Sequence, residues 1–404
     1  MQNNLSSYFQ GIGIKRLSEV EIKSTSNQHE FNGTSVFKQL FGSEKTKFNG
    51  RFMFLSETED QIIEDQGTLT WYDARENHET RTEYRLYYTT NDVISSSSVG
   101  DLLIIGKAKD GALIIIVAAK DSTAEKQLMW LFGFHEVEDR FIIKDLSSDK
   151  KELGFASKHI LSSIGLEIHD SRPDFLNLLL DKFGERFPTT KEFSDFTRTT
   201  IKEISLKDSP DEALLMWIER EEVLFKTLEA HLVSKKLKSG FGKNKIDVDE
   251  FISFSLSVHQ RRKSRAGHSF ENHLLYIFNS LGIAQTKGGK TENNNKPDFI
   301  FPGINYYHIS DFDSNYLTML GVKTSAKDRW RQILSEANKI SIKHLITLEP
   351  AISKGQTDQM KAEKAQLVIP KGLINTYSSD QQKDILMFTD FIALVSKKQS
   401  SLKL

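Results

Sequence analysis

Apolar and polar positions alternate along much of the first 170 residues, a pattern typical of strands. Segments rich in β-branched and aromatic residues are expected to be strands at 51–56, 68–73, 82–90, 101–108 and 112–119. The KDG sequence at 109–111 predicts a hairpin turn. Short helices are expected at 35–40 and 122–131. Because several strands are apolar throughout, we expect a mostly β domain that is closed or barrel-like.

From residue 171 onward the apolar residues follow a helical period. The PTTKE sequence at 188–192 predicts a helix start, with Thr189 or Thr190 as the N-cap. A further helix is expected to begin after Asp247, which is also a good N-cap. The change of pattern predicts an N-terminal domain at 1–170, a linker at 171–184 and a C-terminal domain at 185–404.

Past residue 267, helices alternate with short apolar strands. A helix is expected at 268–281, with Glu271 at the edge of its apolar stripe. A later helix, defined by Trp330 and Ile333 among others, carries Glu336 at the edge of its stripe. Apolar strands are expected at 297–302, 317–322, 344–350 and 365–370. This alternation predicts an α/β domain whose central sheet is covered by helices on both faces.

Composition narrows the class of protein. The 404 residues include 54 Lys and Arg against 55 Asp and Glu, so net charge is near zero and any basic surface has to be local. The absence of cysteine excludes disulfides and thiolate metal sites and fits a reducing cytoplasm. No apolar run is long enough to span a bilayer, and the N-terminus lacks the apolar core of a signal peptide. We expect a cytoplasmic protein without a membrane partner.

Ionisable residues mark the strand ends of the C-terminal domain. Asp298 opens one strand, Lys323 ends the next, and Glu336 follows on a helix, with Glu271 in support from an earlier helix. Hydrolysis of a phosphodiester needs hard oxygen ligands for Mg²⁺ and a cation that positions water and stabilises the transition state. Asp298 and Glu336 are the candidate Mg²⁺ ligands, and Lys323 is the candidate cation. Each of these residue types is common, so the order carries more weight than any one residue.

Basic residues are grouped at three places. Arg81 and Arg85 are four apart on an expected strand and would share one face, with Arg75 just before them. Lys15 and Arg16 form an adjacent basic pair. The RRKSR cluster at 261–265, which includes Arg262 and Arg265, is the densest in the chain. These side chains either bind DNA phosphates and base edges or lie on a solvated face, with Arg81 and Arg85 partly paired to Glu79 or Glu83.

Sequence motifs resemble a known family. SRAGHSFENHL (264–274), KPDFIFPG (296–303) and VKTSAKDRWRQILSEANKI (322–340) resemble the catalytic domain of the EcoRII family of type II (type IIE) restriction endonucleases, which belong to the PD-(D/E)XK nuclease superfamily. The resemblance extends over about 185–400. The sequences YDARENHETRTEYR (72–85) and IKRLS (14–18) resemble the effector domain of that family.

The resemblance implies a fold and an activity. The C-terminal domain would have a restriction-endonuclease-like central mixed sheet flanked by helices, with Glu271, Asp298, Lys323 and Glu336 as catalytic residues and the second acid on a helix. Lys327, Asp328 and Arg329 would read outer C:G pairs of a CC…GG-type site in double-stranded DNA. The N-terminal domain would be a DNA-binding pseudobarrel that binds a second copy of the site and otherwise blocks the catalytic cleft. Arg75, Arg81 and Arg85 would face that DNA.

Partners follow from the same reading. A palindromic target needs two active sites related by a twofold axis, which a homodimer supplies. A DNA methyltransferase would be the functional counterpart in a bacterial restriction–modification system, without direct contact. The sequence also admits a non-enzymatic DNA-binding regulator that retains a nuclease-like fold, and a repair or RNA nuclease. The intact set of four ionisable residues favours an enzyme over a regulator, and the match at 327–329 disfavours the repair or RNA nuclease.

Overall fold

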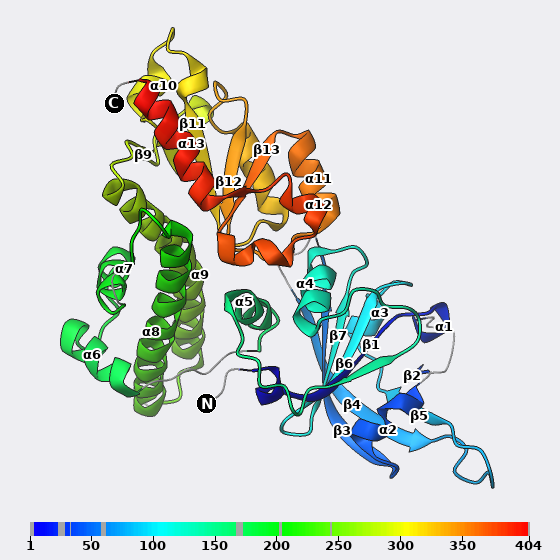
Figure 1. The fold of residues 1–404 in the computed structure, drawn as a ribbon. Helices are drawn as coiled ribbons and strands as arrows, with labels where there is room; N and C mark the ends of the chain where they lie inside the picture. Colours follow the sequence, from blue (N-terminus) through cyan, green and yellow to red (C-terminus); the bar gives the residue numbers. More distant parts are fainter. Residues whose placement is uncertain are drawn as a thin grey trace. The chain divides into compact units, whose positions relative to one another are not determined.

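A computed structural model describes residues 4–22, 29–32, 34–57, 62–166, 173–201, 204–242 and 245–402. The chain divides into two compact units, which Figure 1 draws as ribbons. Unit 1 comprises Met1–Ile168 and Pro350–Gly355, and unit 2 comprises His169–Glu349 and Gln356–Leu404. The assignment of an effector domain and a catalytic domain to these units stays a prediction.

Unit 1 is mostly β, as expected. Its strands in the described residues are β1 (Phe9–Arg16), β2 (Glu30–Phe31), β3 (Thr46–Leu55), β4 (Ile63–Asp73), β5 (Tyr84–Tyr88), β6 (Leu102–Ala108), β7 (Leu113–Ala118) and β8 (Ile142–Asp145). They form one curled sheet in the order β2-β5-β4-β3-β7-β6-β1-β8. Among the described pairings within this sheet, only the β3–β7 ladder is parallel. The curled, mostly β architecture confirms the expected fold class.

Both faces of this sheet are buried, which explains the strands that are apolar throughout. Ile104 and Ile116 belong to one core cluster, whereas their neighbours Ile105 and Val117 belong to another on the opposite face. Gly111 in the β6–β7 turn has φ 90°, the left-handed region that the expected hairpin requires.

Short helices complete unit 1. They are the α-helices α1 (Glu19–Ile22), α2 (Lys38–Phe41), α3 (Asp92–Ser95), α4 (Thr123–Phe132) and α5 (Phe155–Ser163) and the 3-10 helices η1 (Leu5–Ser7) and η2 (Thr34–Phe37). The expected helices at 35–40 and 122–131 are confirmed by η2 with α2 and by α4.

Sequence reasoning missed β1, because glycine replaces the apolar residue at alternate positions. In its FQGIGIKR sequence Ile12 and Ile14 are buried, whereas Gly11 and Gly13 face the side chains of Leu40 and Phe37. A Cβ added to Gly13 would lie 2.1 Å from the Phe37 ring. The glycines therefore make room for side chains that pack on the strand.

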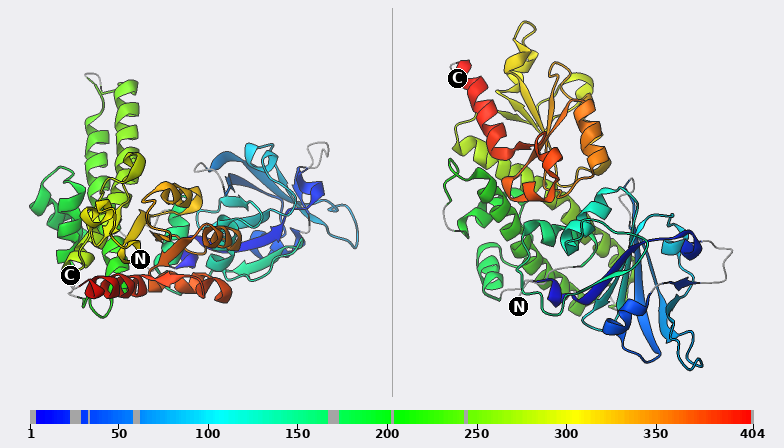
Figure 2. Two further views of the ribbon diagram at one scale, coloured as in Figure 1. Left: turned by 90° about the horizontal axis from the view of Figure 1, so that it is seen from above. Right: turned by 45° about the vertical axis from the view of Figure 1, so that its right-hand side comes forward.

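Unit 2 begins with helices. These are α6 (Pro173–Phe183), α7 (Thr190–Thr199), α8 (Pro210–Ser239) and α9 (Val248–Ser280). The expected caps are confirmed: Thr189 forms a capping box with Glu192 before α7, and Asp247 caps α9. Helices α8 and α9 lie side by side in Figures 1 and 2. Both carry charged side chains along their length, and in the described part of the chain no helix is suited to crossing a membrane.

Helix α9 corrects the expected helix start near residue 268. It is one continuous helix of 33 residues that runs through the basic cluster and through Gly267. Its buried stripe, which includes Val258, Arg265, Phe270 and Leu274, continues across this point. Packing along the whole stripe outweighs the local helix penalty of glycine, about 1 kcal/mol.

A mixed sheet follows α9. Its strands are β9 (Thr286–Lys287), β10 (Phe299–Phe301), β11 (Thr318–Lys323), β12 (Lys343–Thr347), β13 (Ala365–Ile369) and β14 (Leu386–Met387), in the order β14-β13-β12-β11-β10-β9. Strands β11 to β14 are parallel, and β9 and β10 pair antiparallel. The expected strands and the α/β fold class are confirmed.

Further helices surround this sheet (Figure 2). They are the α-helices α10 (Ile304–His308), α11 (Lys354–Ala362), α12 (Ser379–Gln382) and α13 (Phe388–Ser401) and the 3-10 helices η3 (Glu292–Asn294), η4 (Ser314–Tyr316), η5 (Lys327–Ser335) and η6 (Lys371–Thr376). Phe278 of α9 packs edge-on against Phe299 and Phe301 of β10, and Phe391 of α13 packs against Phe301. This aromatic cluster fixes α9 on the strand that follows Asp298.

The close packing of β1 predicts the effect of a substitution. Gly13→Ser should destabilise unit 1 by about 1–3 kcal/mol, because the new side chain would collide with Phe37. Gly154→Ser is the control, since this N-cap has φ −74° and an added Cβ meets no atom within 4 Å. Urea denaturation of both variants measures the difference, and equal midpoints would contradict the packing account.

Candidate active site

Asp298 and Lys323 lie on neighbouring strands of the unit 2 sheet. Asp298 directly precedes β10, and the antiparallel register pairs Phe299 with Leu320 of β11. Asp298 is therefore beside the end of β11, where its Oδ2 accepts a hydrogen bond from the Val322 N–H at 2.7 Å. The Lys323 Nζ is 3.9 Å from the same oxygen, and the two side chains are 24% and 22% exposed for Lys323 and Asp298. The sheet brings together the acid and the lysine expected from the sequence.

Glu336 reaches this site from a turn, so its expected position on a helix is wrong. Helix η5 is a 3-10 helix that ends at Ser335. Glu336 has extended backbone angles (φ −91°, ψ 145°), and Ala337 has φ 50°. The buried side chains of Trp330 and Ile333 are three residues apart, a spacing that a 3-10 helix aligns and that also fits an α-helix. The apolar stripe could not distinguish the two helix types.

Burial and like charge dominate the electrostatics of the site. Burial, followed by the negative charge of Asp298, raises the pKa of Glu336 to about 7. Burial also raises the pKa of Asp298; the Val322 N–H and Lys323 oppose this rise, and the charge of Glu271 adds to it. The Glu336 Oε2 atom is buried and has no hydrogen-bond partner among the described residues. Near neutral pH, Glu336 is thus balanced between its protonated and ionised forms.

Glu271 joins the group from α9. Its Oε2 is 2.9 Å from the Nζ of Lys287 on β9. The β9–β10 pairing places Lys287 opposite Phe299, and its charge lowers the pKa of Asp298. Sequence reasoning missed Lys287, because a two-residue strand has no periodic pattern and only the pairing with β10 brings this lysine to the site.

The carboxylates of the site suit a divalent cation. Over the described ranges, no group of three or more His, Cys, Asp or Glu side chains is arranged to hold a metal ion. The protein ligands expected from the sequence are the two carboxylates of Asp298 and Glu336. Mg²⁺ is commonly held by one or two carboxylates, with waters and substrate phosphate as the other ligands. A cation would relieve the repulsion between the two acids and bind the unpartnered Glu336 Oε2, so the residues present fit this ion.

The predicted base-reading segment begins η5. The side chains of Lys327 and Asp328 lie outside the described residues, and Arg329 is partly buried. Before them, the Ala326 N–H donates to the carboxylate of Glu349 at 2.5 Å. Glu349 is 3% exposed and anchors the start of η5, a role that sequence reasoning missed. Its signal was an acid two residues after β12, a strand that is buried throughout.

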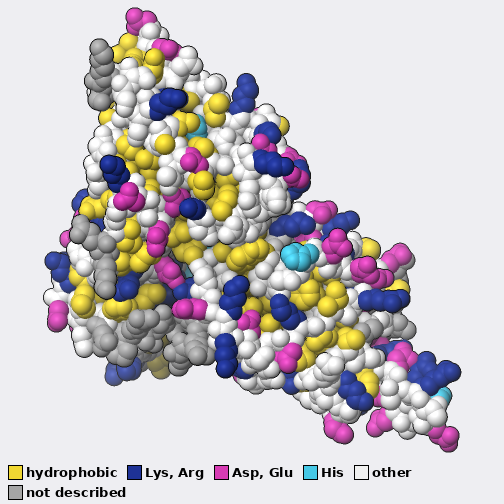
Figure 3. Space-filling view, viewed as in Figure 1, with side chains coloured by type: hydrophobic (Ala, Val, Ile, Leu, Met, Phe, Trp, Pro, Cys, Tyr) yellow, Lys and Arg dark blue, Asp and Glu magenta, His cyan; other side chains and the backbone are white. Residues whose placement is uncertain are grey.

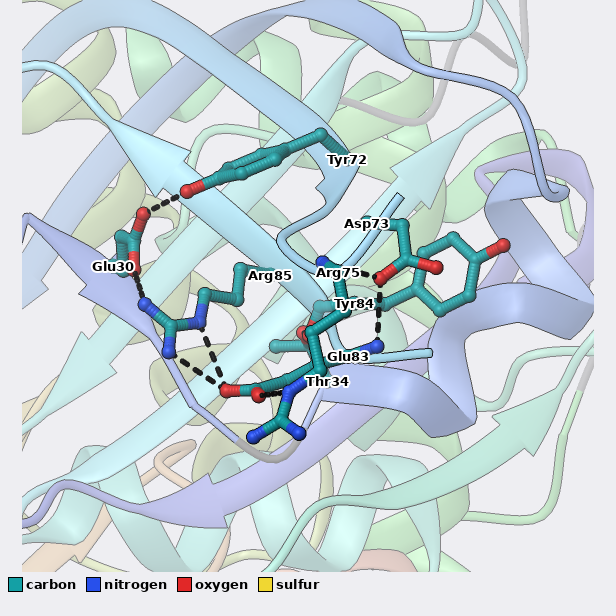
Figure 4. Close-up of polar contacts among 8 residues, drawn as sticks. All are labelled: Glu30, Thr34, Tyr72, Asp73, Arg75, Glu83, Tyr84 and Arg85. Atoms are coloured by element: carbon teal, nitrogen blue, oxygen red, sulfur yellow. Dashed lines mark hydrogen bonds and ion pairs between the residues drawn. The ribbon is translucent and has the colours of Figure 1, made fainter. Parts of the chain in front are cut away.

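Arg75 and Arg85 of unit 1 are held by acids (Figure 4). Glu83 lies 2.5 Å from the Arg75 Nε and 2.7 Å from the Arg85 Nη2. Arg85 also donates to Glu30 at 2.7 Å, and Glu30 accepts a hydrogen bond from the Tyr72 hydroxyl. Arg85, and then Arg75, hold the pKa of Glu83 below its ordinary value. The structure thus shows arginines paired with Glu83, which was the alternative to DNA contact that the sequence left open. Contact of Arg75 and Arg85 with DNA stays a prediction.

Arg81 does not share a strand face with Arg85. It is exposed in the loop before β5, and the β4–β5 ladder begins only at the pair Asp73 and Tyr84. The expectation of a common face is therefore wrong, because the strand begins later than its alternating pattern indicated. A DNA contact by Arg81 stays a prediction for a loop residue.

Lys15 and Arg16 are both paired with buried acids. The Lys15 ammonium is buried and donates to both carboxylate oxygens of Glu21 at 2.8 Å. Arg16 Nη2 is 2.8 Å from Glu125 Oε1, whose side chain is fully buried. Both cations neutralise buried acids of unit 1, and the Lys15 ammonium is itself buried, whereas the Arg16 side chain is 25% exposed and its contact with DNA stays a prediction.

The basic cluster at 261–265 has a similar internal role. The side chain of Arg265 is 9% exposed and is paired with Glu222 of α8. The Arg262 Nη2 is 2.6 Å from the buried Glu229, although the arginine side chain stays 43% exposed. The structure contradicts a phosphate contact for Arg265, because its guanidinium is buried between helices. For Arg262 the contact stays a prediction.

Charges of both signs are mixed on the protein surface. On the face drawn in Figure 3, Lys and Arg side chains are interspersed with Asp and Glu. The mixture agrees with the near-zero net charge of the sequence. Binding of a polyanion would therefore depend on local geometry more than on overall charge.

Comparisons with known proteins point to one family. Residues 225–392 match the family model described as "EcoRII C terminal". The type II restriction enzyme EcoRII of Escherichia coli is 37% identical over 230 residues, which cover 57% of this chain and 55% of that enzyme. The type II restriction enzyme SsoII of Shigella sonnei is 24% identical over 148 residues, which cover 34% of this chain and 47% of that enzyme. The chain spans about half the length of the curated relatives it matches.

The chain is also similar to a solved structure, described as metal-depleted Ecl18kI in complex with uncleaved, modified DNA. The match has a TM-score of 0.47 and 19% sequence identity, and it covers 57% of this chain and 85% of the Ecl18kI chain. The matched residues 225–392 include Glu271, Asp298, Lys323 and Glu336. This C-terminal part of the chain is therefore similar to the EcoRII C-terminal family of type II restriction enzymes, the family that its sequence motifs resemble.

Proposed function

We propose that the chain is a Mg²⁺-dependent type II restriction endonuclease that hydrolyses phosphodiester bonds of double-stranded DNA. The observation that carries this proposal is the group of Asp298, Lys323 and Glu336, in which Lys323 is 3.9 Å from Asp298 and a buried Glu336 oxygen has no hydrogen-bond partner among the described residues. This group lies within the segment that matches the EcoRII C-terminal family. A regulator that only binds DNA would not need a buried pair of acids beside a lysine.

The residues of the site have separate tasks in this proposal. Asp298 and Glu336 would hold Mg²⁺, which would supply Lewis-acid stabilisation of charge on the scissile phosphate. Lys323 orients the attacking water and stabilises negative charge on the phosphate. Glu271 holds Lys287 at 2.9 Å and so keeps a second cation beside Asp298. The Val322 N–H fixes the orientation of the Asp298 carboxylate.

Specificity would come from the segment that joins Lys323 to Glu336. Lys327, Asp328 and Arg329 are proposed to read the outer pairs of a CC…GG-type palindrome, since Lys and Arg donate to guanine and Asp accepts from cytosine. A homodimer would present two such sites to the two strands. The bacterial cytoplasm, together with a DNA methyltransferase that protects the same sequence, is the expected setting.

Unit 1 is proposed to bind a further copy of the DNA site and to restrain cleavage until it does so. Arg75 and Arg85 are the proposed contacts. Their ion pairs with Glu83 and Glu30 preorganise the guanidinium groups but also have to be exchanged for contacts with phosphate or guanine. Such an exchange would make effector binding sensitive to salt.

Replacing Lys323 tests the enzymatic role. Lys323→Ala should lower the rate of Mg²⁺-dependent plasmid cleavage by about 10³-fold or more, because the site loses its transition-state cation. Specific DNA binding in a gel-shift assay should change little. Lys361→Ala, at a lysine side chain that is 65% exposed, is the control and should cleave normally. Retained cleavage by Lys323→Ala would reject the assignment, and specific binding by a wild-type chain that does not cleave would favour the regulator.

Removal of residues 1–170 tests the restraint. The truncated chain should cleave DNA that carries a single site several-fold faster than the full chain, because the proposed block of the active site is gone. Initial rates on plasmids with one site and with two sites measure the effect. If truncation leaves the single-site rate unchanged, the proposed autoinhibition does not operate in this chain.

The raised pKa of Glu336 predicts a pH-dependent stability in metal-free protein. The folded pKa of about 7 exceeds the ordinary 4.5, so the stabilising contribution is complete below pH 4.5 and is lost as pH rises through 7. Glu336→Gln should therefore be more stable than wild type at pH 8.5, by roughly 1–2 kcal/mol after allowance for solvent screening, and nearly equal at pH 5.

Denaturation in the presence of EDTA at both pH values measures this difference. Added Mg²⁺ should reduce the advantage of Glu336→Gln at pH 8.5, because the cation stabilises the ionised carboxylate of the wild type. An advantage of the same size at both pH values would show that the charge of Glu336 is not its cause.

A further inference from the structure

The segment around Glu336 adopts a backbone that its own sequence does not favour. Ala337 has φ 50°, in the left-handed region where a residue with a Cβ is strained by about 1 kcal/mol or more. It is also fully buried. Such a conformation persists only where surrounding groups hold it. Side chains from other elements contact the backbone on both sides of Glu336.

Lys343 holds one side of the turn. It is the first residue of β12 and is only 6% exposed, yet its ammonium donates to the Ala337 carbonyl oxygen at 2.6 Å. Burial lowers the pKa of Lys343, while the nearby carboxylates of Glu292 and Glu336 raise it. Burying an ammonium is costly unless it is bonded and close to opposite charge. The mechanism proposed above gives this lysine no task.

Glu292 binds the same peptide group as Lys343, at its N–H. Its carboxylate accepts a hydrogen bond from the Asn338 N–H at 3.2 Å and is itself fixed by the Tyr307 hydroxyl at 2.6 and 2.7 Å. From the same polar loop, the Asn295 Nδ2 donates to the Ser335 carbonyl oxygen at 2.8 Å. The loop between β9 and β10 therefore binds the backbone immediately before and two residues after Glu336.

We propose that Lys343 and Glu292 are positioning residues for Glu336. By fixing the Ala337 carbonyl and the Asn338 N–H, they hold the turn so that the unpartnered Glu336 Oε2 stays available to a divalent cation beside Asp298. They act through the backbone and take no part in the chemistry. The inference rests on the proposed function and extends it to the geometry of the metal ligand.

Lys398 provides a matched control. It is a partly buried lysine of unit 2, on α13, and burial lowers its pKa as it does for Lys343. Its ammonium donates to the Leu317 carbonyl oxygen at 3.1 Å and to the Thr318 Oγ1 at 3.0 Å. These contacts lie at the start of β11, whereas Lys323 lies at its end. Removal of Lys398 perturbs stability without reaching the turn of Glu336.

The test compares Lys343→Met and Lys398→Met in the full chain. Mn²⁺ alone is titrated into metal-free protein, and the bound ion is followed by electron paramagnetic resonance. Lys343→Met should weaken Mn²⁺ binding by about 10–100-fold, and Lys398→Met should bind as wild type. In Mg²⁺-dependent plasmid cleavage, Lys343→Met should lower kcat and leave KM for DNA within about twofold.

Wild-type Mn²⁺ affinity in Lys343→Met, or an equal loss in Lys398→Met, would overturn the positioning role. If the wild type itself neither binds Mn²⁺ nor cleaves DNA, the proposed function fails instead. Should Lys343→Met not fold, the partly buried Glu292 offers a second pair of variants. Glu292→Ala should weaken Mn²⁺ binding, whereas Glu292→Gln keeps an acceptor for the Asn338 N–H and should retain most of it. Equal affinities of these two variants would also overturn the proposal.

Discussion

Repulsion between two partly buried carboxyl groups, Asp298 and Glu336, is the constraint on which the candidate site depends. Burial raises the pKa of both; the charge of Asp298 adds to the rise for Glu336, and the charge of Glu271 adds to the rise for Asp298. A fold that served stability alone would separate them or pair each with a cation. Here Lys323 is 3.9 Å from Asp298, and one oxygen of Glu336 has no hydrogen-bond partner among the described residues. The stored electrostatic cost is the physical basis for binding a divalent cation at this place.

The surrounding fold maintains this unfavourable arrangement. The antiparallel pairing of β10 with β11 aligns Asp298 with the Val322 N–H, and the aromatic contacts of Phe278 hold α9 against β10. The chain from Lys323 to Glu336 is anchored where Glu349 binds the Ala326 N–H. The proposed base-reading residues lie between this anchor and the turn that carries Glu336. A correct base contact would therefore be transmitted to the metal ligand through a short and well-fixed piece of chain.

Much of this arrangement could be predicted from the sequence, and the exceptions have physical reasons. Apolar strands that end in Lys323 or follow Asp298 are local patterns, and so are the caps Thr189 and Asp247. Lys287 and Lys343 were missed because strand pairing and a turn bring them to the site. The helical position expected for Glu336 was wrong, because Trp330 and Ile333 satisfy the period of a 3-10 helix as well as that of an α-helix.

The basic residues show where grouping along the sequence does not reveal what a side chain contacts. Lys15, Arg16 and Arg265 looked like candidates for DNA contact, but each is bonded to an acid that is distant or unremarkable in the sequence. Arg75 and Arg85 are also paired, but their side chains are 42% and 28% exposed, and their contact with DNA stays a proposal.

The central claim is that the carboxylates and Lys323 form a site for specific DNA cleavage. Digestion of a plasmid of known sequence with the purified chain and Mg²⁺, followed by sequencing of the ends, tests it most directly. The account predicts ends at one short recurring sequence of the CC…GG type. Intact plasmid, or ends scattered without a common sequence, would contradict it.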